Sequence, residues 1–232
     1  MERVAVITGA SQGLGFELAR SLAADGWSLV IDARRADLLD RAHAAIEAAA
    51  EHGAKVTAIA GDVADAGHRA HLADAARTAG PVRLVVNNAS TLGASPLPAL
   101  VDLDAATYLR TLEVNLVAPM ALVAALADQL GDGATIVNVS SDAAVEPYDH
   151  WGGYGSSKAG LDHASMILAQ EHPTWRVLAV DPGDLDTELH RAAFPGEDLS
   201  ELPGPEAAVP GFRTLIDGTL PSGRYRAQEL VR

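Results

Sequence analysis

Short runs rich in β-branched residues alternate with Ala- and Leu-rich stretches along most of this chain. This alternation is typical of repeated strand–helix units, which build a parallel sheet with helices on both faces. It predicts strands near residues 3–8, 28–32, 55–60, 82–87, 134–140 and 175–181. It predicts helices near residues 13–25, 36–52, 66–79, 105–130 and 154–171, and a short one near 205–217. No linker interrupts the pattern, so we expect one α/β domain across residues 1–232.

The composition narrows the possible partners of such a domain. The 232-residue chain is 48 % hydrophobic, which suits one domain with a sizeable core. Its net charge of −14 argues against nucleic acid or an anionic membrane surface as a partner. With no cysteine, the chain has no disulfide or cysteine–metal site, which fits a cytoplasmic location. We expect no signal peptide before the first strand, and the apolar run Leu116–Ala127 is too short to span a bilayer.

A glycine-rich turn, Thr8 to Gly15, directly follows the first predicted strand and opens the first helix. Its three glycines, Gly9, Gly13 and Gly15, allow a tight turn and a close approach of the backbone to a pyrophosphate. The free N–H groups at the start of the helix then favour the phosphate charge. The alternative is a plain glycine-rich turn, but the strand–turn–helix context favours a dinucleotide site.

Tyr154 and Lys158 are four residues apart in a predicted helix, so their side chains share one face. A neighbouring ammonium is expected to lower the tyrosine pKa from its usual value of about 10, so that the phenol can exchange a proton with a substrate oxygen. Ser141 ends a predicted buried strand and could bind the same oxygen. The alternative is an incidental pair on a surface helix. Only two lysines occur in the chain, Lys55 and Lys158, which makes a chance placement improbable.

Together these motifs resemble the short-chain dehydrogenase/reductase family over residues 3–187. The resemblance rests on Thr8-Gly-x-x-x-Gly13-x-Gly15, Asn87-Asn88-Ala89, Asn115, Ser141, Tyr154-x-x-x-Lys158 and Pro182-Gly183…Thr187. It implies a Rossmann-like, doubly wound parallel sheet of about seven strands. It also implies hydride transfer between nicotinamide C4 and a carbonyl or alcohol carbon.

The resemblance assigns a role to each catalytic residue. Ser141 binds the substrate oxygen, Tyr154 transfers the proton, and Lys158 lowers the tyrosine pKa and holds the nicotinamide ribose. Asn115 interrupts its helix and holds a water that reaches Lys158; the alternative is an amide that only caps or kinks the helix. Ser140 competes with Ser141, but strand alternation points the two to opposite faces. The implied cofactor contacts are Gly9, Ser11, Gln12, Gly13, Leu14, Gly15, Arg34, Arg35, Asp62, Val63, Asn88, Ala89, Tyr154, Lys158, Pro182, Gly183 and Thr187.

The choice of cofactor should be made at the end of the second strand, where Asp32, Ala33, Arg34 and Arg35 follow one another. An acid there can bind the ribose 2′-OH of NAD, whereas an arginine accommodates the 2′-phosphate of NADP. Aligned to the family, Ala33 replaces the usual NAD-selecting acid and Arg34 matches the basic residue of NADP-preferring members. We therefore expect NADP(H), with NAD(H) possible through Asp32. Alternatively, Arg34 and Arg35 are the solvated start of the next helix.

Other polar residues have two interpretations each. The resemblance gives Asp62 and Val63 a role in holding adenine, but Asp62 could instead cap the next helix. Asn87 and Asn88 are expected mainly to brace neighbouring strands. Ser90 stands where members of the family usually have a glycine. No histidine has a second ligand at a metal spacing, so we expect no metal site.

The substrate side is expected to comprise the loop 146–153 and, by resemblance, a lid over residues 184–205. The tail lacks the family's usual Asp-Gly-Gly, which puts its common tetramer in doubt. A homodimer through helices 105–130 and 154–171 is the default, with a tetramer not excluded. The sequence thus predicts a cytoplasmic, NADP(H)-preferring carbonyl reductase or alcohol dehydrogenase for small molecules. The alternatives are an NAD-dependent alcohol dehydrogenase of the same family and a non-catalytic dinucleotide sensor or scaffold.

Overall fold

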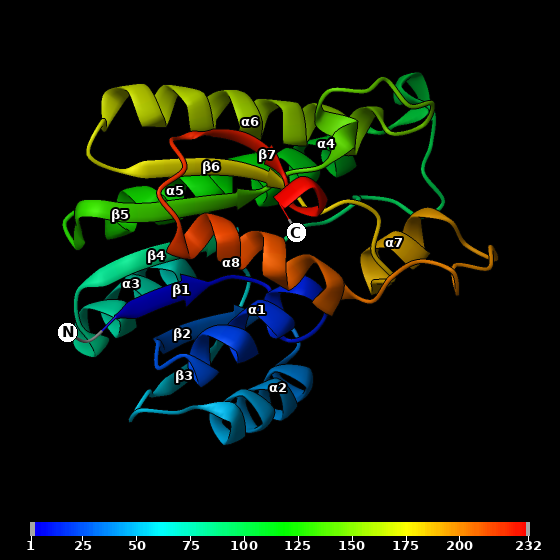
Figure 1. Cartoon of the computed structure of the whole chain (residues 1–232). Coiled ribbons are helices and arrows are strands. Elements are labelled where there is room, and N and C mark those ends of the chain that lie inside the picture. Colours follow the sequence, from blue (N-terminus) through cyan, green and yellow to red (C-terminus); the bar gives the residue numbers. More distant parts are fainter. Residues whose placement is uncertain (1–2, 231–232) are drawn as a thin grey trace.

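The computed structural model of the protein describes residues 3–230 and contains one seven-stranded parallel sheet (Figure 1). The strand order is β3-β2-β1-β4-β5-β6-β7, and every pair is parallel. The chain reverses its direction of travel across the sheet between β1 and β4, which is where doubly wound sheets bind ligands. The strands are β1 Val4–Ile7, β2 Ser28–Ala33, β3 Val56–Ala60, β4 Val82–Asn87, β5 Leu130–Val139, β6 Arg176–Asp181 and β7 Gly223–Arg226. The predicted Rossmann-like fold is confirmed.

Helices cover both faces of the sheet (Figure 1). The helices are α1 Gly13–Ala24, α2 Ala36–Ala49, α3 Ala66–Ala79, α4 Ala105–Leu112, α5 Ala118–Leu126, α6 Gly152–Glu171, α7 Glu188–Ala193 and α8 Val209–Asp217. In β1, Ala5 and Ile7 pack in the core under α1, α2 and α8, whereas Val4 and Val6 pack in the core under α3 and α5. A strand buried on both faces explains why β1 is apolar at every position.

Most predicted elements are present, and the differences lie late in the chain. Strand β5 begins at Leu130 rather than 134, because the helix before it ends four residues earlier than predicted. The short predicted helix near 205–217 is confirmed as a 3-10 turn, Pro205–Ala208, followed by α8. Strand β7 has the sequence GRYR, which carries no apolar pattern of its own. It forms because β6 offers a free edge with which Gly223–Arg226 pairs.

The predicted helix 105–130 is instead two α-helices joined by a π-helical turn, Glu113–Val117. By length and composition alone the continuous segment Ala105–Leu126 could cross a membrane, with a mean hydropathy of 1.5. However, Leu122 and Leu126 are buried in the core beside the sheet. The α5 part of the segment therefore packs in the core of the domain.

Candidate active site

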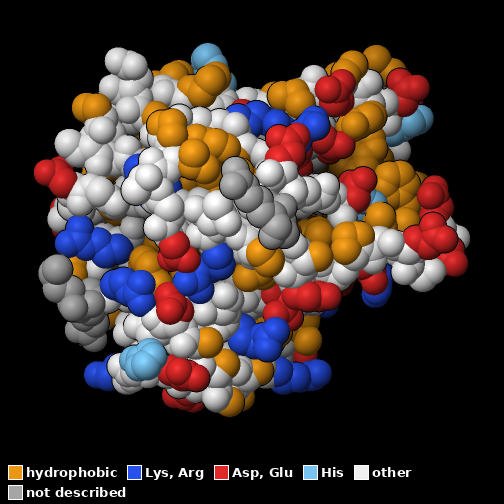
Figure 2. All heavy atoms as spheres, in the orientation of Figure 1, with side chains coloured by type: hydrophobic (Ala, Val, Ile, Leu, Met, Phe, Trp, Pro, Cys, Tyr) orange, Lys and Arg blue, Asp and Glu red, His pale blue; other side chains and the backbone are white. Residues whose placement is uncertain are grey.

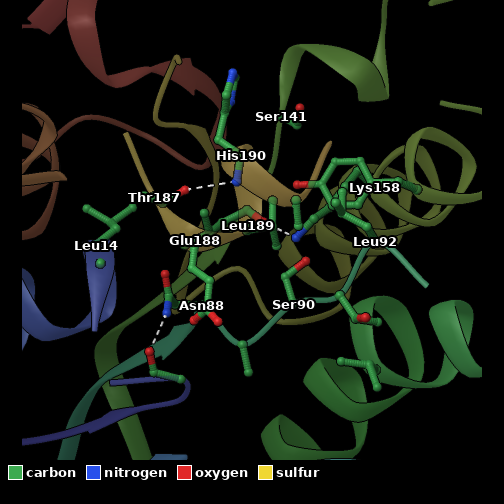
Figure 3. Close-up of a pocket in the computed structure, with 18 of the residues that line it drawn as sticks. Leu14, Asn88, Ser90, Leu92, Ser141, Lys158, Thr187, Glu188, Leu189 and His190 are labelled. Carbon is green, nitrogen blue, oxygen red and sulfur yellow. Dashed lines mark hydrogen bonds between the residues drawn. The ribbon is translucent and has the colours of Figure 1, made fainter. Parts of the chain in front are cut away.

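A cavity of about 1240 Å³ lies at the carboxyl ends of the strands. Its volume suits a dinucleotide together with a small substrate. Figure 3 shows Leu14 and Asn88 on one side of it and Lys158, Leu92 and Ser90 on the other. The cavity brings together most of the site residues expected from the sequence. Those that line it are Gly9, Ser11, Gln12, Gly13, Leu14, Arg34, Arg35, Asp62, Val63, Asn88, Ala89, Ser141, Tyr154, Lys158, Pro182, Gly183 and Thr187.

Gly15 and Asn115 do not line the cavity themselves, but they pack against residues that do. A Cβ on Gly15 would lie 2.6 Å from the carbonyl oxygen of Gly9, so only glycine lets helix α1 pack on the turn. Gly9 itself has a φ of 68°, a left-handed conformation that favours glycine. The Asn88 side chain donates to the carbonyls of Thr8 and Gly9 at 2.9 and 3.1 Å. The turn is thus braced so that the N-terminus of α1 faces the cavity, which fits the pyrophosphate of a dinucleotide.

Asp32, at the end of β2, has a different role from the one considered for it from sequence. Its side chain is only 1 % exposed. One carboxylate oxygen accepts from the Gly9 N–H at 2.8 Å, and the other lies 2.8 Å from Nε2 of His68. The carboxylate therefore braces the glycine turn. His68 is a site residue that sequence reasoning missed, because nothing local pairs it with a residue 36 positions earlier.

The two arginines after Asp32 lie at the surface of the cavity. Arg34 is exposed at the rim. Arg35 donates to Gln12 at 2.9 Å and pairs with Glu188 at 2.7 Å. Glu188 also accepts a hydrogen bond from Gln12, and the pKa of Glu188 is lowered first by that bond and then by Arg35. These contacts tie the segment that begins helix α7 to the glycine turn.

Asp62 is not the cap of the helix that follows it. The cap is Asp65, whose carboxylate accepts from the His68 backbone N–H at 2.7 Å. Asp62 instead accepts from the N–H of Ala64 at 3.0 Å and forms an ion pair with Arg110 of α4. Its predicted contact with adenine stays a prediction, supported by its place in the cavity lining.

The structure corrects the expected electrostatics of Tyr154. Burial raises the pKa of its phenol, and the nearby hydroxyls of Ser90 and Ser141 only partly oppose this rise. Lys158 is 2 % exposed, and burial lowers its own pKa to about 8. Its Nζ lies 5.6 Å from the centre of the tyrosine ring and donates to the Val139 carbonyl at 2.7 Å. The lysine therefore does not make this phenol acidic, and Tyr154 is held as a protonated hydrogen-bond donor.

Ser141 follows β5 and borders the cavity beside Tyr154. Its Oγ donates to a carboxylate oxygen of Asp142 at 2.9 Å and accepts from the N–H of Ala143 at 3.1 Å. The hydroxyl of Ser140, by contrast, is buried without a partner within the described residues.

Asn115 lies in the π-helical turn, as expected of a residue that interrupts helical hydrogen bonding. Its amide group donates to the Thr91 carbonyl at 2.8 Å and to Ser157 Oγ at 2.9 Å. Its oxygen accepts from the N–H of Thr91 at 2.9 Å. These bonds join three segments behind Tyr154, and a water-mediated link to Lys158 stays a prediction.

The substrate side of the cavity is walled by aromatic rings. Trp151 packs edge-on against Tyr154 at 5.6 Å between ring centres and lies 5.8 Å from Phe194. The phenol of Tyr148 donates to Asp142 at 2.9 Å, which raises the Tyr148 pKa. His150, in the same loop 146–153, is exposed. Figure 2 shows acidic and hydrophobic side chains together over the projecting part that carries α7.

Comparison with known proteins shows the family to which the chain belongs. The family model described as short chain dehydrogenase matches residues 3–198. The chain belongs to the short-chain dehydrogenase/reductase family. It is an NAD(P)-dependent oxidoreductase of that family, as the motifs predict.

Several members of the family are similar to this chain over most of its length. The sepiapterin reductase of Meriones unguiculatus is 35 % identical, over 82 % of this chain and 77 % of its own. The benzil reductase ((S)-benzoin forming) of Saccharomyces cerevisiae is 30 % identical, over 90 % and 80 % respectively. An alcohol dehydrogenase from Thermococcus sibiricus, solved with 5-hydroxy-NADP, is 26 % identical with a TM-score of 0.86, covering 97 % of this chain and 96 % of its own.

Arg224 is a second residue of this short-chain dehydrogenase/reductase that sequence reasoning missed. From β7 it donates to the backbone carbonyl of Ser141 at 2.8 Å and to Asp162 of α6 at 2.9 Å. It also lies 3.5 Å from Asp181 at the end of β6. The tail departs from the family's usual sequence, but that departure does not predict a contact with a residue 83 positions earlier. Arg224 links the segment after β5, which carries Ser141, to helix α6, which carries Tyr154.

Proposed function

We propose that this protein is a carbonyl reductase that prefers NADP(H). The observation that carries the proposal is the gathering of Ser141, Tyr154 and Lys158 at one end of a cavity whose other end is the glycine turn. The cofactor preference rests on Arg34, which is exposed at the rim, and on Asp32, whose carboxylate is engaged elsewhere. A guanidinium matches a 2′-phosphate in charge and geometry.

Each residue has a defined part in the proposed mechanism. When bound, NADPH supplies a hydride from nicotinamide C4 to the carbonyl carbon. The hydroxyls of Ser141 and Tyr154 bind the carbonyl oxygen, and Tyr154 gives that oxygen its proton. Burial keeps the phenol protonated, which suits reduction. Lys158 holds the nicotinamide ribose, and Asn115 holds the water that connects Lys158 to solvent.

The walls of the cavity favour a ring-bearing carbonyl compound without negative charge. Trp151 and Phe194 offer flat apolar contacts. The acids Asp142, Asp149 and Asp184 also line the cavity, so a carboxylate or phosphate on the substrate would be repelled. Similar proteins named sepiapterin reductase and benzil reductase support a search among such compounds.

The proposal extends to the assembly and location of the protein. Apolar side chains of Leu109, Val117, Met166 and Ile167 are exposed on the segment 105–126 and on α6. These are the helices that the family resemblance pairs across a two-fold axis, so we propose a homodimer that buries them. The absence of cysteine fits a cytoplasmic location.

A screen of ketones, aldehydes and alcohols that follows NADPH absorbance tests the proposed function. We expect reduction of neutral aromatic ketones and diketones such as benzil, with a higher kcat/KM for NADPH than for NADH. A strong preference for NADH would support the NAD-dependent alternative. Failure of the whole panel, with NADPH still bound, would support the non-catalytic sensor instead.

A further inference from the structure

A buried hydrogen-bond network connects the ends of three strands beneath the adenosine side of the cavity. Asp32 of β2 is 1 % exposed and His68 of α3 is 6 % exposed. The two carboxylate oxygens of Asp32 are divided between partners, Gly9 N–H at 2.8 Å and His68 Nε2 at 2.8 Å. Because both oxygens are engaged and the side chain is almost fully buried at the cavity wall, the direction in which this carboxylate points is fixed.

The imidazole ring is fixed as well. A Cβ on Gly61, the residue after β3, would overlap the His68 ring, so the ring fills the space that a side chain there would need. Asp65 accepts from the His68 backbone N–H at 2.7 Å, which anchors the histidine to the first turn of α3. His68 therefore lies in one position between Gly61 and Asp32.

This arrangement bears on the choice between the two nicotinamide cofactors. A carboxylate at the end of β2 that is free to accept a ribose 2′-OH selects NAD. A second acid at this end of the cavity, Asp62, is held by Arg110. Arg34 and Arg35 are both exposed at the rim, and Arg35 is paired with Glu188. Both acids are thus engaged, while the arginine that suits a 2′-phosphate is presented to the ligand.

We infer that His68 is a positioning residue for cofactor selection: by holding one oxygen of Asp32, it directs the other to Gly9 and keeps this carboxylate away from the ribose. The inference rests on the proposed preference for NADP(H) and assigns that preference a cause outside the residues that touch the cofactor. Without His68, Asp32 is free to turn toward the ribose, where it would attract a 2′-OH and repel a 2′-phosphate.

The test compares NADPH with NADH in His68 variants, by fluorescence titration of binding and by kcat/KM with the best carbonyl substrate. In His68→Ala we expect the NADPH-to-NADH ratio to fall at least tenfold. The change should lie in Kd and KM, with kcat retained. His68→Gln keeps a donor for Asp32 and should restore most of the ratio. His71→Ala, an exposed histidine of the same helix, is the matched control and should not change it.

The variant Asp32→Asn distinguishes positioning of Asp32 by His68 from direct binding of the ribose by Asp32. The amide oxygen can accept from Gly9 and the amide nitrogen can donate to the His68 ring, so the variant should keep the wild-type ratio. If Asp32 itself binds the ribose, Asp32→Asn will instead lose binding of NADH selectively, which overturns the inference. Gly61→Ala supplies a further variant, since its methyl group displaces the ring without removing it. Its ratio should fall like that of His68→Ala.

Circular dichroism melting shows which variants fold. If His68→Ala folds and its NADPH-to-NADH ratio is unchanged, the inference is overturned. If His68→Ala does not fold, an unchanged ratio in Gly61→Ala overturns it. Binding ratios are measured without substrate, so a protein that reduces no carbonyl fails the proposed function while the role of His68 is still tested. A wild-type protein that prefers NADH would contradict both.

Discussion

The two ends of the cavity are built in different ways. At the cofactor end, Gly9, Asp32 and His68 are joined by short hydrogen bonds around two buried side chains. At the substrate end, the loop 145–150 is exposed throughout, and α7 is a helix of only six residues. A dinucleotide of fixed shape is served by a rigid, hydrogen-bonded frame, whereas the substrate meets side chains on connecting segments. Specificity for the substrate can therefore change without disturbing the cofactor frame.

Tyr154→Phe gives the largest expected effect and tests whether the two ends are separable. Removal of the proton donor should lower kcat by about a hundredfold to ten-thousandfold, the usual contribution of general acid catalysis. Because the phenyl ring still fills the same buried space, NADPH should bind with nearly unchanged Kd in a fluorescence titration. Retained turnover would contradict the assigned role of Tyr154. A large loss of NADPH binding would show instead that the two ends are coupled.

Arg34→Ala tests the cofactor end alone. Loss of a charge-assisted hydrogen bond worth about 1.5–3 kcal/mol should raise the KM for NADPH by about ten- to a hundredfold. The KM for NADH should stay within about twofold, since NADH has no 2′-phosphate. Arg41→Ala, an exposed arginine of α2 paired with Asp37, is the matched control. An equal loss for both cofactors would contradict a contact between Arg34 and the phosphate.

Arg224→Met tests whether the catalytic residues of the substrate end depend on support from the last strand. Without the bonds to the Ser141 carbonyl and Asp162, Ser141 should shift relative to Tyr154. We expect kcat to fall about tenfold while the KM for NADPH is retained, since a small misplacement of catalytic groups is costly. Arg226→Met, a half-exposed neighbour in β7, serves as control. Equal kcat in both variants would show that Arg224 only stabilises the fold.

The pH dependence of NADPH binding gives the smallest expected effect, at Lys158, where the two ends meet. Burial lowers the pKa of this lysine to about 8, below its ordinary value of 10.5. The side chain is therefore charged below pH 8 and neutral above it. A donor worth about 1 kcal/mol to the bound cofactor is weakened on deprotonation, so the Kd for NADPH should rise about three- to fourfold between pH 7 and 9. Lys158→Met should not show this rise; an equal rise in that variant would assign the pH dependence to another group.

The positions of several site residues could be predicted from the sequence, but the effect of burial on their pKa values could not. Asn87 was expected to brace strands, and it does so, donating to Asn138 of the neighbouring strand at 2.7 Å. Tyr154 and Ser141 were both expected at the site and both line it. The Tyr154 pKa was expected to fall, but burial raises it. Sequence spacing shows which groups are neighbours, and it does not show how much water surrounds them.

The sequence by itself determined the order of the first six strands and most of the helices between them, the glycine turn after β1, and the placement of Tyr154 and Lys158 on one helical face. These features follow from local periodicity and backbone conformation, which a short window of residues contains. Only the tertiary structure decided that Asp32 turns to His68 and that Arg224 holds the carbonyl of Ser141. These contacts join segments 36 and 83 residues apart, and each depends on how the sheet brings strand ends together.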